Sequence, residues 1–393
     1  MTRSRRRRTG IPIIVAALLL AGCQGTGATS AGVKARAPDA AAGPAVPAPP
    51  PGPVPGQAVL DVYRNDRPGN LSPVVASMPT RLYVPNSDES TVDEIDPSTG
   101  KVVRHFPTGK LPQHVVPAWD LKTLYVANDL GNSLTPIDPT TGEPGTPIPV
   151  DDPYNVYFTP DGRSALVVAE RLARLDFRDP HTFALQRSVG VPCKGVDHLD
   201  FSADGSYLIA SCEFAGTVVK VRLDGPDGPR VEGAPLPLRP KAQPQDVKLS
   251  PDGTVFYVAD MVSGGVWVLD GEHLGVLGFL PTANGAHGLY VSRDSSSLYV
   301  SNRAASSISV IDLPTRTVRT TWKLPGNASP DMGGVSADGG TLWVSGRTSR
   351  EIYGIDTTSG QLTARIPVGR GPHGLCVYPQ PGTYSLGHTG IFR

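Results

Sequence analysis

The sequence lacks the short motifs by which many enzymes are recognised, because it contains no HExxH, CxxC, Walker A or GxSxG pattern. It also lacks an excess of charge of either sign, since 36 Lys and Arg balance 36 Asp and Glu. Cysteine is scarce, with 4 in 393 residues, and the one long apolar run covers residues 11–20. These absences count against a HExxH metalloprotease, a CxxC redox enzyme, a P-loop nucleotidase and a polytopic membrane protein.

The first 23 residues are typical of a secretory targeting segment. Several arginines precede the apolar run, and Leu20-Ala21-Gly22-Cys23 follows it. This ending resembles the lipobox of bacterial lipoproteins, and the resemblance implies that Cys23 becomes the lipidated N-terminus of the mature chain. An ordinary secretory signal with an incidental cysteine is the alternative. The lipobox interpretation predicts a protein anchored by lipid on the extracytoplasmic face of the bacterial cell membrane.

Residues 24–57 are rich in Ala, Gly and Pro and cannot bury a core, so we expect a disordered tether there. Removal of the signal leaves 31 basic residues against 36 acidic ones, with no remaining Lys/Arg cluster. We therefore expect a protein that does not bind nucleic acid. A monomer is also expected. The membrane, through the lipid anchor, and an unknown surface protein, peptide or polymer are the expected partners.

The rest of the chain is organised by a repeat. An apolar opening strand recurs near residues 82, 124, 166, 208, 256, 298 and 342, so the period is 42 to 48 residues. Each unit contains three further strand patterns, with turns rich in Asp, Pro and Gly between them. Four short strands per repeat predict an all-β fold, a seven-bladed β-propeller of four-stranded antiparallel blades spanning residues 58–393.

The repeat also carries a family resemblance. LYVANDLGNSLTPIDPTTG, which begins at Leu124, and LYVSNRAASSISVIDLPT, which begins at Leu298, resemble the YVTN-repeat (YncE-like) seven-bladed β-propellers, a subgroup of which are bacterial lipoproteins. The resemblance covers about residues 72–386. It implies the fold but indicates function only weakly, because propellers bind many unrelated ligands.

Two expectations concern the cysteines and the end of the chain. Cys193 and Cys212 flank one predicted hairpin and are expected to form a disulfide, whereas Cys376 is expected to be a buried thiol. Residues 384–386 fall one period after Leu342, so the C-terminal tail is expected to echo an opening strand and pin the first and last blades together.

Polar residues recur where each innermost strand is expected to begin. Six of these seven starts carry His or Asp, and four of the eight His of the chain lie there. Together with polar residues after the opening strands they predict a top-face binding site or a divalent metal site, Ca or Zn, on the propeller axis. The alternative is a polar channel lining. The candidate residues are His114, Asn155, Asp197, His198, Asp246, His287, Asp331, His373, Asn128, Glu170, Glu213 and Asp260.

Two classes of function stay open, and no catalytic residue is assigned. The first is a binding or interaction scaffold that uses its top face. The second is a metal-assisted lactone or ester hydrolase, because a weaker resemblance to lactonase propellers implies Ca²⁺ held by Glu170, Asn128, Asn155, Asp246 and Asp260, with His198 or His287 as general base. A copper site of several axial His, which similarity to the propeller of nitrous oxide reductase would imply, is a minor third option.

Overall fold

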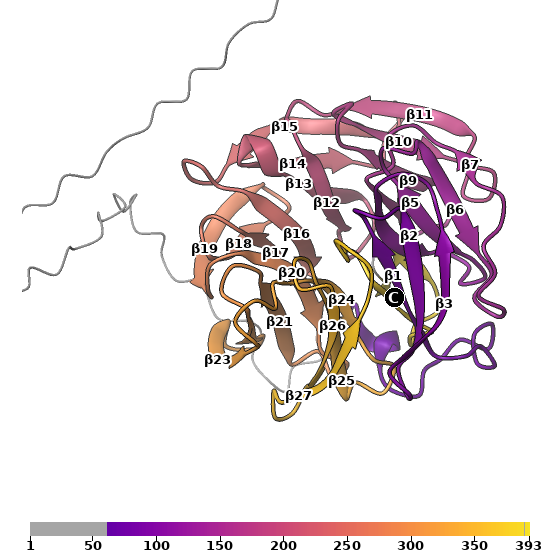
Figure 1. Cartoon of the computed structure of the whole chain (residues 1–393). Coiled ribbons are helices and arrows are strands. Elements are labelled where there is room, and N and C mark those ends of the chain that lie inside the picture. Colours follow the sequence, from indigo (N-terminus) through magenta and orange to yellow (C-terminus); the bar gives the residue numbers. More distant parts are fainter. Residues whose placement is uncertain (1–60, 389) are drawn as a thin grey trace, which may run out of the picture. The chain divides into compact units, whose positions relative to one another are not determined.

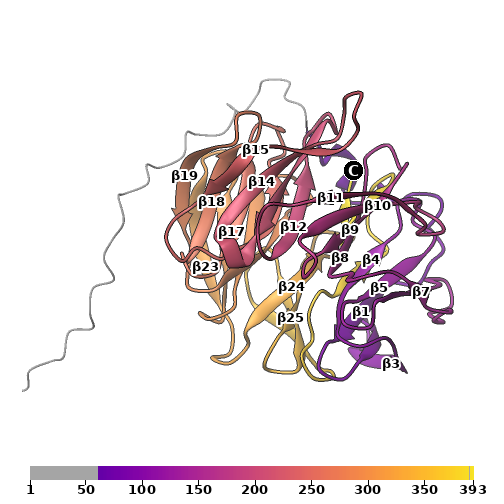
Figure 2. The same ribbon diagram turned by 90° about the horizontal axis from the view of Figure 1, so that it is seen from above.

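The computed structural model describes residues 61–388 and 390–393, which form a seven-bladed propeller of antiparallel sheets (Figures 1 and 2). This confirms the predicted fold class. The predicted signal peptide, residues 1–23, and the predicted tether, residues 24–57, lie outside the described residues. Only two short 3-10 helices occur in the described part, η1 (Arg64–Asp66) and η2 (Glu213–Ala215), and no helix there is long and apolar enough to cross a membrane.

The strands of each blade are counted outward from the axis. The innermost strands are fully or almost fully buried, because both of their faces pack against neighbouring blades. They are β4 (Pro112–Pro117), β8 (Asn155–Phe158), β12 (Val196–Phe201), β16 (Pro244–Leu249), β20 (Ala286–Val291), β24 (Pro330–Val335) and β28 (Cys376–Tyr378). The second strands begin at, or one residue before, the predicted repeat starts. They are β1 (Arg81–Asn86), β5 (Leu124–Asn128), β9 (Ala165–Ala169), β13 (Tyr207–Cys212), β17 (Phe256–Asp260), β21 (Ser297–Asn302) and β25 (Thr341–Gly346).

The two outer positions of each blade become progressively more exposed and more polar. The third strands are β2 (Thr91–Asp96), β6 (Ser133–Ile137), β10 (Arg174–Arg178), β14 (Thr217–Arg222), β18 (Gly265–Asp270), β22 (Ser307–Asp312) and β26 (Glu351–Asp356). The outermost strands are β3 (Lys101–Pro107), β7 (Ile148–Pro149), β11 (Leu185–Gly190), β15 (Arg230–Pro237), β19 (Gly275–Pro281), β23 (Thr317–Lys323) and β27 (Leu362–Pro367). The apolar core therefore lies between blades, around the inner and second strands.

The ring is closed by one strand from the C-terminal part of the chain. β28 pairs antiparallel with β1, with Leu82 opposite Val377, and so completes the blade that β1, β2 and β3 begin. Residues 72–77 begin one 42-residue period before His114, where the repeat would place the inner strand of the first blade, but they form turns instead. The two ends of the chain are thus joined in the first blade, in the position that residues 72–77 would otherwise fill.

The last residues do not form the opening strand that their spacing suggests. β29 (Ser385–Gly387) pairs with β8, on the axial side of that blade, and β30 (Ile391–Phe392) pairs with β29. The tail lies near the middle of the ring in Figure 1, and its residues Leu386, Ile391 and Phe392 are buried. The expectation for residues 384–386 was wrong because β1 already occupies the opening position of the first blade.

Candidate functional site at the propeller axis

The polar residues of the inner strands reach the axis through irregularities in strand pairing. In β12, β16, β20 and β24, two residues of the inner strand lie opposite one residue of the second strand. Such a bulge turns side chains away from the regular alternation. The bulged pairs are Asp197-His198, Gln245-Asp246, His287-Gly288 and Asp331-Met332.

Serines of the second strands hold three of these bulges in place. The hydroxyl of Ser211 accepts a hydrogen bond from the backbone N–H of His198, and Ser301 and Ser345 do the same for Gly288 and Met332. The hydrogen bonds found for these hydroxyls are with backbone groups and not with the histidine rings. The bulges instead serve to fix the directions of the axial side chains.

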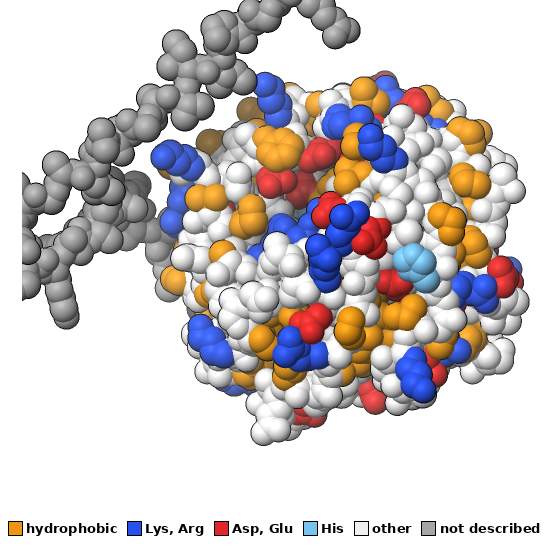
Figure 3. Space-filling model, in the orientation of Figure 1, with side chains coloured by type: hydrophobic (Ala, Val, Ile, Leu, Met, Phe, Trp, Pro, Cys, Tyr) orange, Lys and Arg blue, Asp and Glu red, His pale blue; other side chains and the backbone are white. Residues whose placement is uncertain are grey.

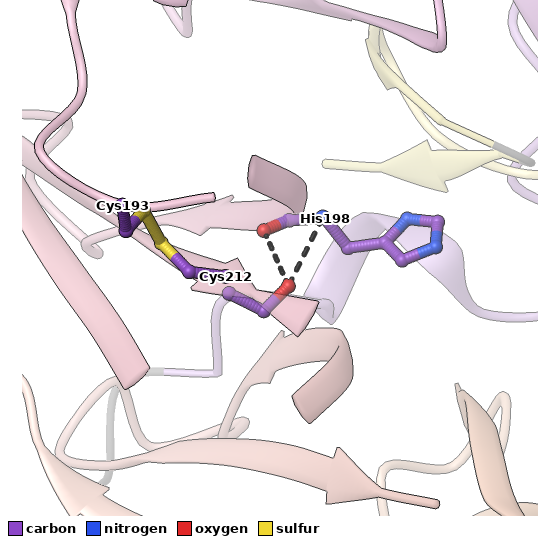
Figure 4. The surroundings of a disulfide bond; sticks show 4 residues. Cys193, His198 and Cys212 are labelled. Carbon is purple, nitrogen blue, oxygen red and sulfur yellow. Dashed lines mark hydrogen bonds between the residues drawn. A yellow bond between two sulfur atoms is a disulfide. The ribbon is translucent and has the colours of Figure 1, made fainter. Parts of the chain in front are cut away.

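A disulfide strengthens the same region in the fourth blade. Cys193 and Cys212 are bonded, with their Cα atoms 6.0 Å apart, and Cys212 directly follows the serine that binds His198. Figure 4 shows the bridge and the two hydrogen bonds between the Ser211 hydroxyl and the backbone of His198. The disulfide therefore ties the loop before β12 to the strand that supports His198. Cys376 is a buried free thiol.

Eight His and Asp side chains meet at the axis, all of them buried. Seven belong to the predicted set, and the eighth is His388, which the tail carries in from the end of the chain. They are His114, His198, His287, His373, His388, Asp197, Asp246 and Asp331. Asn155 is also buried here, where its amide contacts the rings of His198 and His388.

Six of these side chains form two groups with the geometry of a metal site. In the first, His198, Asp246 and His388 offer ligand atoms that lie within 4.8 Å of one another. Here His388 Nε2 lies 3.4 Å from Asp246 Oδ1. We call this group the tail triad, because the tail supplies one member.

The second group, His287, Asp331 and His373, meets the same 4.8 Å criterion, and we call it the ring triad. His287 Nδ1 lies 3.1 Å from Asp331 Oδ1, and His373 Nε2 lies 3.6 Å from Asp331 Oδ2. Neither carboxylate oxygen of Asp331 has a hydrogen-bond partner within the described residues. Arg303 approaches the same carboxylate, with Nε 3.4 Å from Oδ1.

His114 lies between the two triads. The centre of its ring is 4.8 Å from that of His373, 5.3 Å from that of His198 and 5.4 Å from that of His388. Neither ring nitrogen of His114 has a hydrogen-bond partner in the described part of the chain. This packing requires Gly374, because a Cβ at that position would lie 2.1 Å from His114 Nδ1.

Burial sets the protonation of the cluster. It lowers the pKa of His114, His287 and His373 well below the usual range, and it lowers the pKa of His198 to about 3. Burial also raises the pKa of Asp331, against the charges of Arg303 and Arg347. The pKa of Asp246 falls below its usual range, because Lys248 and His388 outweigh the effect of burial. The axis therefore presents neutral imidazoles, which are the form that binds metal ions.

Two glutamates and two arginines that follow second strands lie on different arcs of the ring. Glu170 follows β9 and Glu213 follows β13, in two adjacent blades, whereas Arg303 follows β21 and Arg347 follows β25, in two adjacent blades further round the ring. We call these four residues the mouth. Burial and the neighbouring charges of Glu213 and Asp129 raise the pKa of Glu170 to about 7. In the space-filling view, acidic and basic side chains gather around the middle of the molecule (Figure 3).

The structure does not bring all predicted candidates to the axis. Asn128 donates hydrogen bonds to Ser133 and Thr135 in its own blade. Asp260 accepts hydrogen bonds from Ser263 and from the indole N–H of Trp267. Both side chains thus hydrogen-bond within their own blades, where they hold turns and strands in place.

Comparisons with known proteins agree on the architecture. A model of a family described as YNCE-like beta-propeller matches residues 68–380. No curated protein matches the sequence.

Among solved structures, the periplasmic gluconolactonase of Pseudomonas aeruginosa is 22% identical, with a TM-score of 0.63. The match covers 77% of the present chain and 99% of the gluconolactonase. A functionally unknown protein from Desulfotomaculum acetoxidans is 17% identical, with a TM-score of 0.65. The match covers 76% of the present chain and 98% of that protein. A 6-phosphogluconolactonase, assigned only provisionally, from Bacteroides uniformis is 18% identical, with a TM-score of 0.58 and coverages of 75% and 98%. At these identities the similarity shows the fold alone.

Proposed function

The chain belongs to the YNCE-like β-propeller family, and from that premise we propose that it is a lipid-anchored extracytoplasmic binding protein that captures a ligand at its mouth. The observation that carries the proposal is the separation of charge, with Glu170 and Glu213 on one arc of the ring and Arg303 and Arg347 on another. The ligand is then one with both a cationic and an anionic group, as a peptide segment has.

The protonation of the acidic arc supports binding. Glu170 forms no salt bridge among the described side chains, and the nearby charge of Arg171 does not offset burial and the neighbouring acids. Burial raises the pKa of Glu213, against its hydrogen bond with Gln245. A partly buried carboxylate without a partner is unfavourable until a cation or a hydrogen-bond donor arrives. A ligand ammonium or guanidinium group supplies both.

The mouth proposal is tested by calorimetric titration of the full chain, in detergent, with zwitterionic oligopeptides and with neutral sugars. We expect oligopeptides to bind and Glu213→Gln or Arg347→Gln to weaken binding at least about tenfold, since each removes a charge-assisted contact. Lys122→Gln, on an exposed turn at the other end of an inner strand, is the control and should bind normally. Equal affinity in all variants, or equal affinity for neutral sugars, would rule the mouth out.

The location is tested separately. Attachment through lipid on Cys23 would keep the protein in the membrane fraction, and we expect Cys23→Ser to release it as a soluble extracytoplasmic protein. Membrane retention of Cys23→Ser, or recovery of the wild-type chain in the cytoplasm, would contradict the anchor. We propose a monomer whose partner is a surface protein, peptide or polymer and not nucleic acid.

A second function, hydrolysis of a lactone or ester, is favoured by one observation. A carboxyl with a pKa of about 7, such as that of Glu170, suits a general base at neutral pH. The expected result is turnover of a lactone or aryl ester that Glu170→Gln abolishes without unfolding the protein. If a broad panel of lactones and esters is not turned over with Ca²⁺, Zn²⁺ or Mn²⁺ present, this alternative is rejected.

A further inference from the structure

We propose that the ring triad of His287, Asp331 and His373 binds one transition-metal ion of the imidazole-preferring class, zinc or copper, beneath the mouth. The metal site uses other ligand residues than the mouth, but it adjoins the mouth through Arg303, which contacts Asp331. It is also distinct from the calcium site that a lactonase would use, because two of its three ligands are imidazoles.

The orientation of His373 is the first argument. Its Nδ1 lies 3.0 Å from the backbone carbonyl oxygen of Gln113, and because a carbonyl can only accept, the proton of this neutral imidazole lies on Nδ1. Nε2 then carries a lone pair and faces Asp331 Oδ2 across 3.6 Å. Two acceptors face one another in a buried site, and a cation between them removes the conflict. A metal-binding histidine is commonly oriented by such a bond from its second nitrogen to a carbonyl.

The remaining atoms around Asp331 complete the donor set. His287 Nδ1 lies 3.1 Å from Oδ1 of Asp331, an oxygen without a hydrogen-bond partner among the described residues. The thioether sulfur of Met332 lies 3.2 Å from the same nitrogen. Two imidazoles and a carboxylate suit zinc, and a nearby thioether favours copper, above all Cu(I).

His114 supplies an independent indication of a ligand. It is fully buried, neither of its ring nitrogens has a hydrogen-bond partner in the described chain, and its ring centre lies 4.8 Å from that of His373. A buried polar group without a partner is uncommon in native proteins and usually has a functional explanation. His114 stands outside the 4.8 Å group, and a metal at the ring triad would give it a role as a further ligand if its ring turns toward the ion.

The tail triad is the weaker candidate despite its similar composition. Asn155 Oδ1 accepts the N–H of Val156, so its Nδ2 faces His388 Nδ1 at 2.8 Å and donates to it. His388 therefore carries its proton on Nε2, which points toward Asp246 Oδ1. A donor thus faces an acceptor across 3.4 Å in the tail triad, although neither atom has a hydrogen-bond partner of good geometry in the described chain. The tail triad therefore lacks the opposed acceptors that favour a cation at the ring triad.

Arg303 opposes cation binding, because its guanidinium shares Asp331 with the ring triad. The carboxylate offers two oxygens, so one can face Arg303 while the other faces the metal. Replacing Arg303 and replacing Asp331 should therefore change metal affinity in opposite directions. Arg303→Gln should tighten metal binding, whereas Asp331→Asn should weaken it.

The experiment uses the full chain in detergent, purified without chelator or metal-affinity tag and dialysed separately against Zn²⁺, Cu²⁺ and Ca²⁺. Bound metal is measured by inductively coupled plasma mass spectrometry. We expect about one equivalent of Zn²⁺ or Cu²⁺ and no Ca²⁺, which prefers oxygen ligands. Asp331→Asn and His373→Gln should each lose at least about tenfold in affinity, and His388→Gln, the matched control in the tail triad, should bind normally.

Three outcomes would overturn the assignment. They are the absence of Zn²⁺ and Cu²⁺ binding to the folded wild-type chain, unchanged affinity in folded Asp331→Asn, and loss of metal in His388→Gln with retention in Asp331→Asn. If the Asp331 variant does not fold, the visible spectrum of Co²⁺ in His373→Gln and His388→Gln decides, because only the variant of the triad that holds the ion should lose imidazole-dependent bands. Met332→Leu separates the two metals, since it should weaken Cu(I) binding and leave Zn²⁺ binding unchanged.

Discussion

The protonation of Glu170 predicts a pH-dependent gain of stability when this residue is replaced. Its pKa is about 7 in the folded protein, against a usual value of 4.5, because of burial and then the nearby Glu213, Asp129 and Asp152. Between these two values the folded state binds a proton that the unfolded state has lost, so stability falls as pH rises and stops falling above pH 7. The shift corresponds to about 3 kcal/mol of lost stability at pH 8.

Glu170→Gln should remove this loss. We expect the variant to be more stable than the wild type by up to about 3 kcal/mol at pH 8, which is roughly 5 °C in melting temperature, and to match it at pH 4. Thermal melts followed by circular dichroism at pH 4, 6 and 8 measure the difference. Glu143→Gln changes an exposed carboxylate and is the control. A melting difference that stays constant across this pH range would refute the burial argument.

Three further predictions concern the supports of the axis. Deleting residues 383–393 removes buried Leu386, Ile391 and Phe392 and should lower stability by about 5 kcal/mol or more, so an unchanged melt would contradict the packing of the tail. Replacing Cys193 and Cys212 by Ser removes a crosslink between residues 19 positions apart and should lower the free energy of unfolding, measured in urea, by about 3 kcal/mol. We expect dithiothreitol to lower the stability of the wild type and to leave that of this variant unchanged. Gly374→Ala should displace His114, whose Nδ1 would lie 2.1 Å from the new Cβ, and weaken Zn²⁺ binding, whereas normal binding would remove His114 from the donor set.

The repeat made the fold predictable. Four strands per period and turns rich in Asp and Gly are local features, and seven copies allow only a ring. The slot that holds His114, His198, His287 and His373 was predictable for the same reason, because equivalent positions of a closed ring face one axis. The sequence could not reveal the bulges, since these depend on pairing with serines of the neighbouring strand.

The positions of His388, Asn128 and Asp260 could not be predicted from the sequence. The spacing of the tail suggested another opening strand, and only the closure through β28 shows that this place is taken and that His388 turns to the axis. Asn128 and Asp260 stand at the same repeat position as Glu170, yet their side chains turn back into their own blades. The repeat position is therefore shared, whereas the direction of the side chain depends on local partners such as Thr135 and Trp267.

The order in which the axis is completed links the site to the closure of the ring. Asp331 and His287 belong to blades that form from continuous sequence, whereas His373 precedes β28, the strand that pairs with β1 only when the two ends of the chain meet. A metal held by the ring triad would thus bind the closed ring in preference to an open one, and by linkage it would stabilise the closure. At a metal concentration one hundred times the dissociation constant, that stabilisation is about 2.7 kcal/mol. Zn²⁺ or Cu²⁺ should therefore protect the amides of β1 and β28 from hydrogen exchange more than those of β18, which lies inside a blade of continuous sequence. Equal protection of all three strands would show that metal binding does not stabilise the closure of the ring.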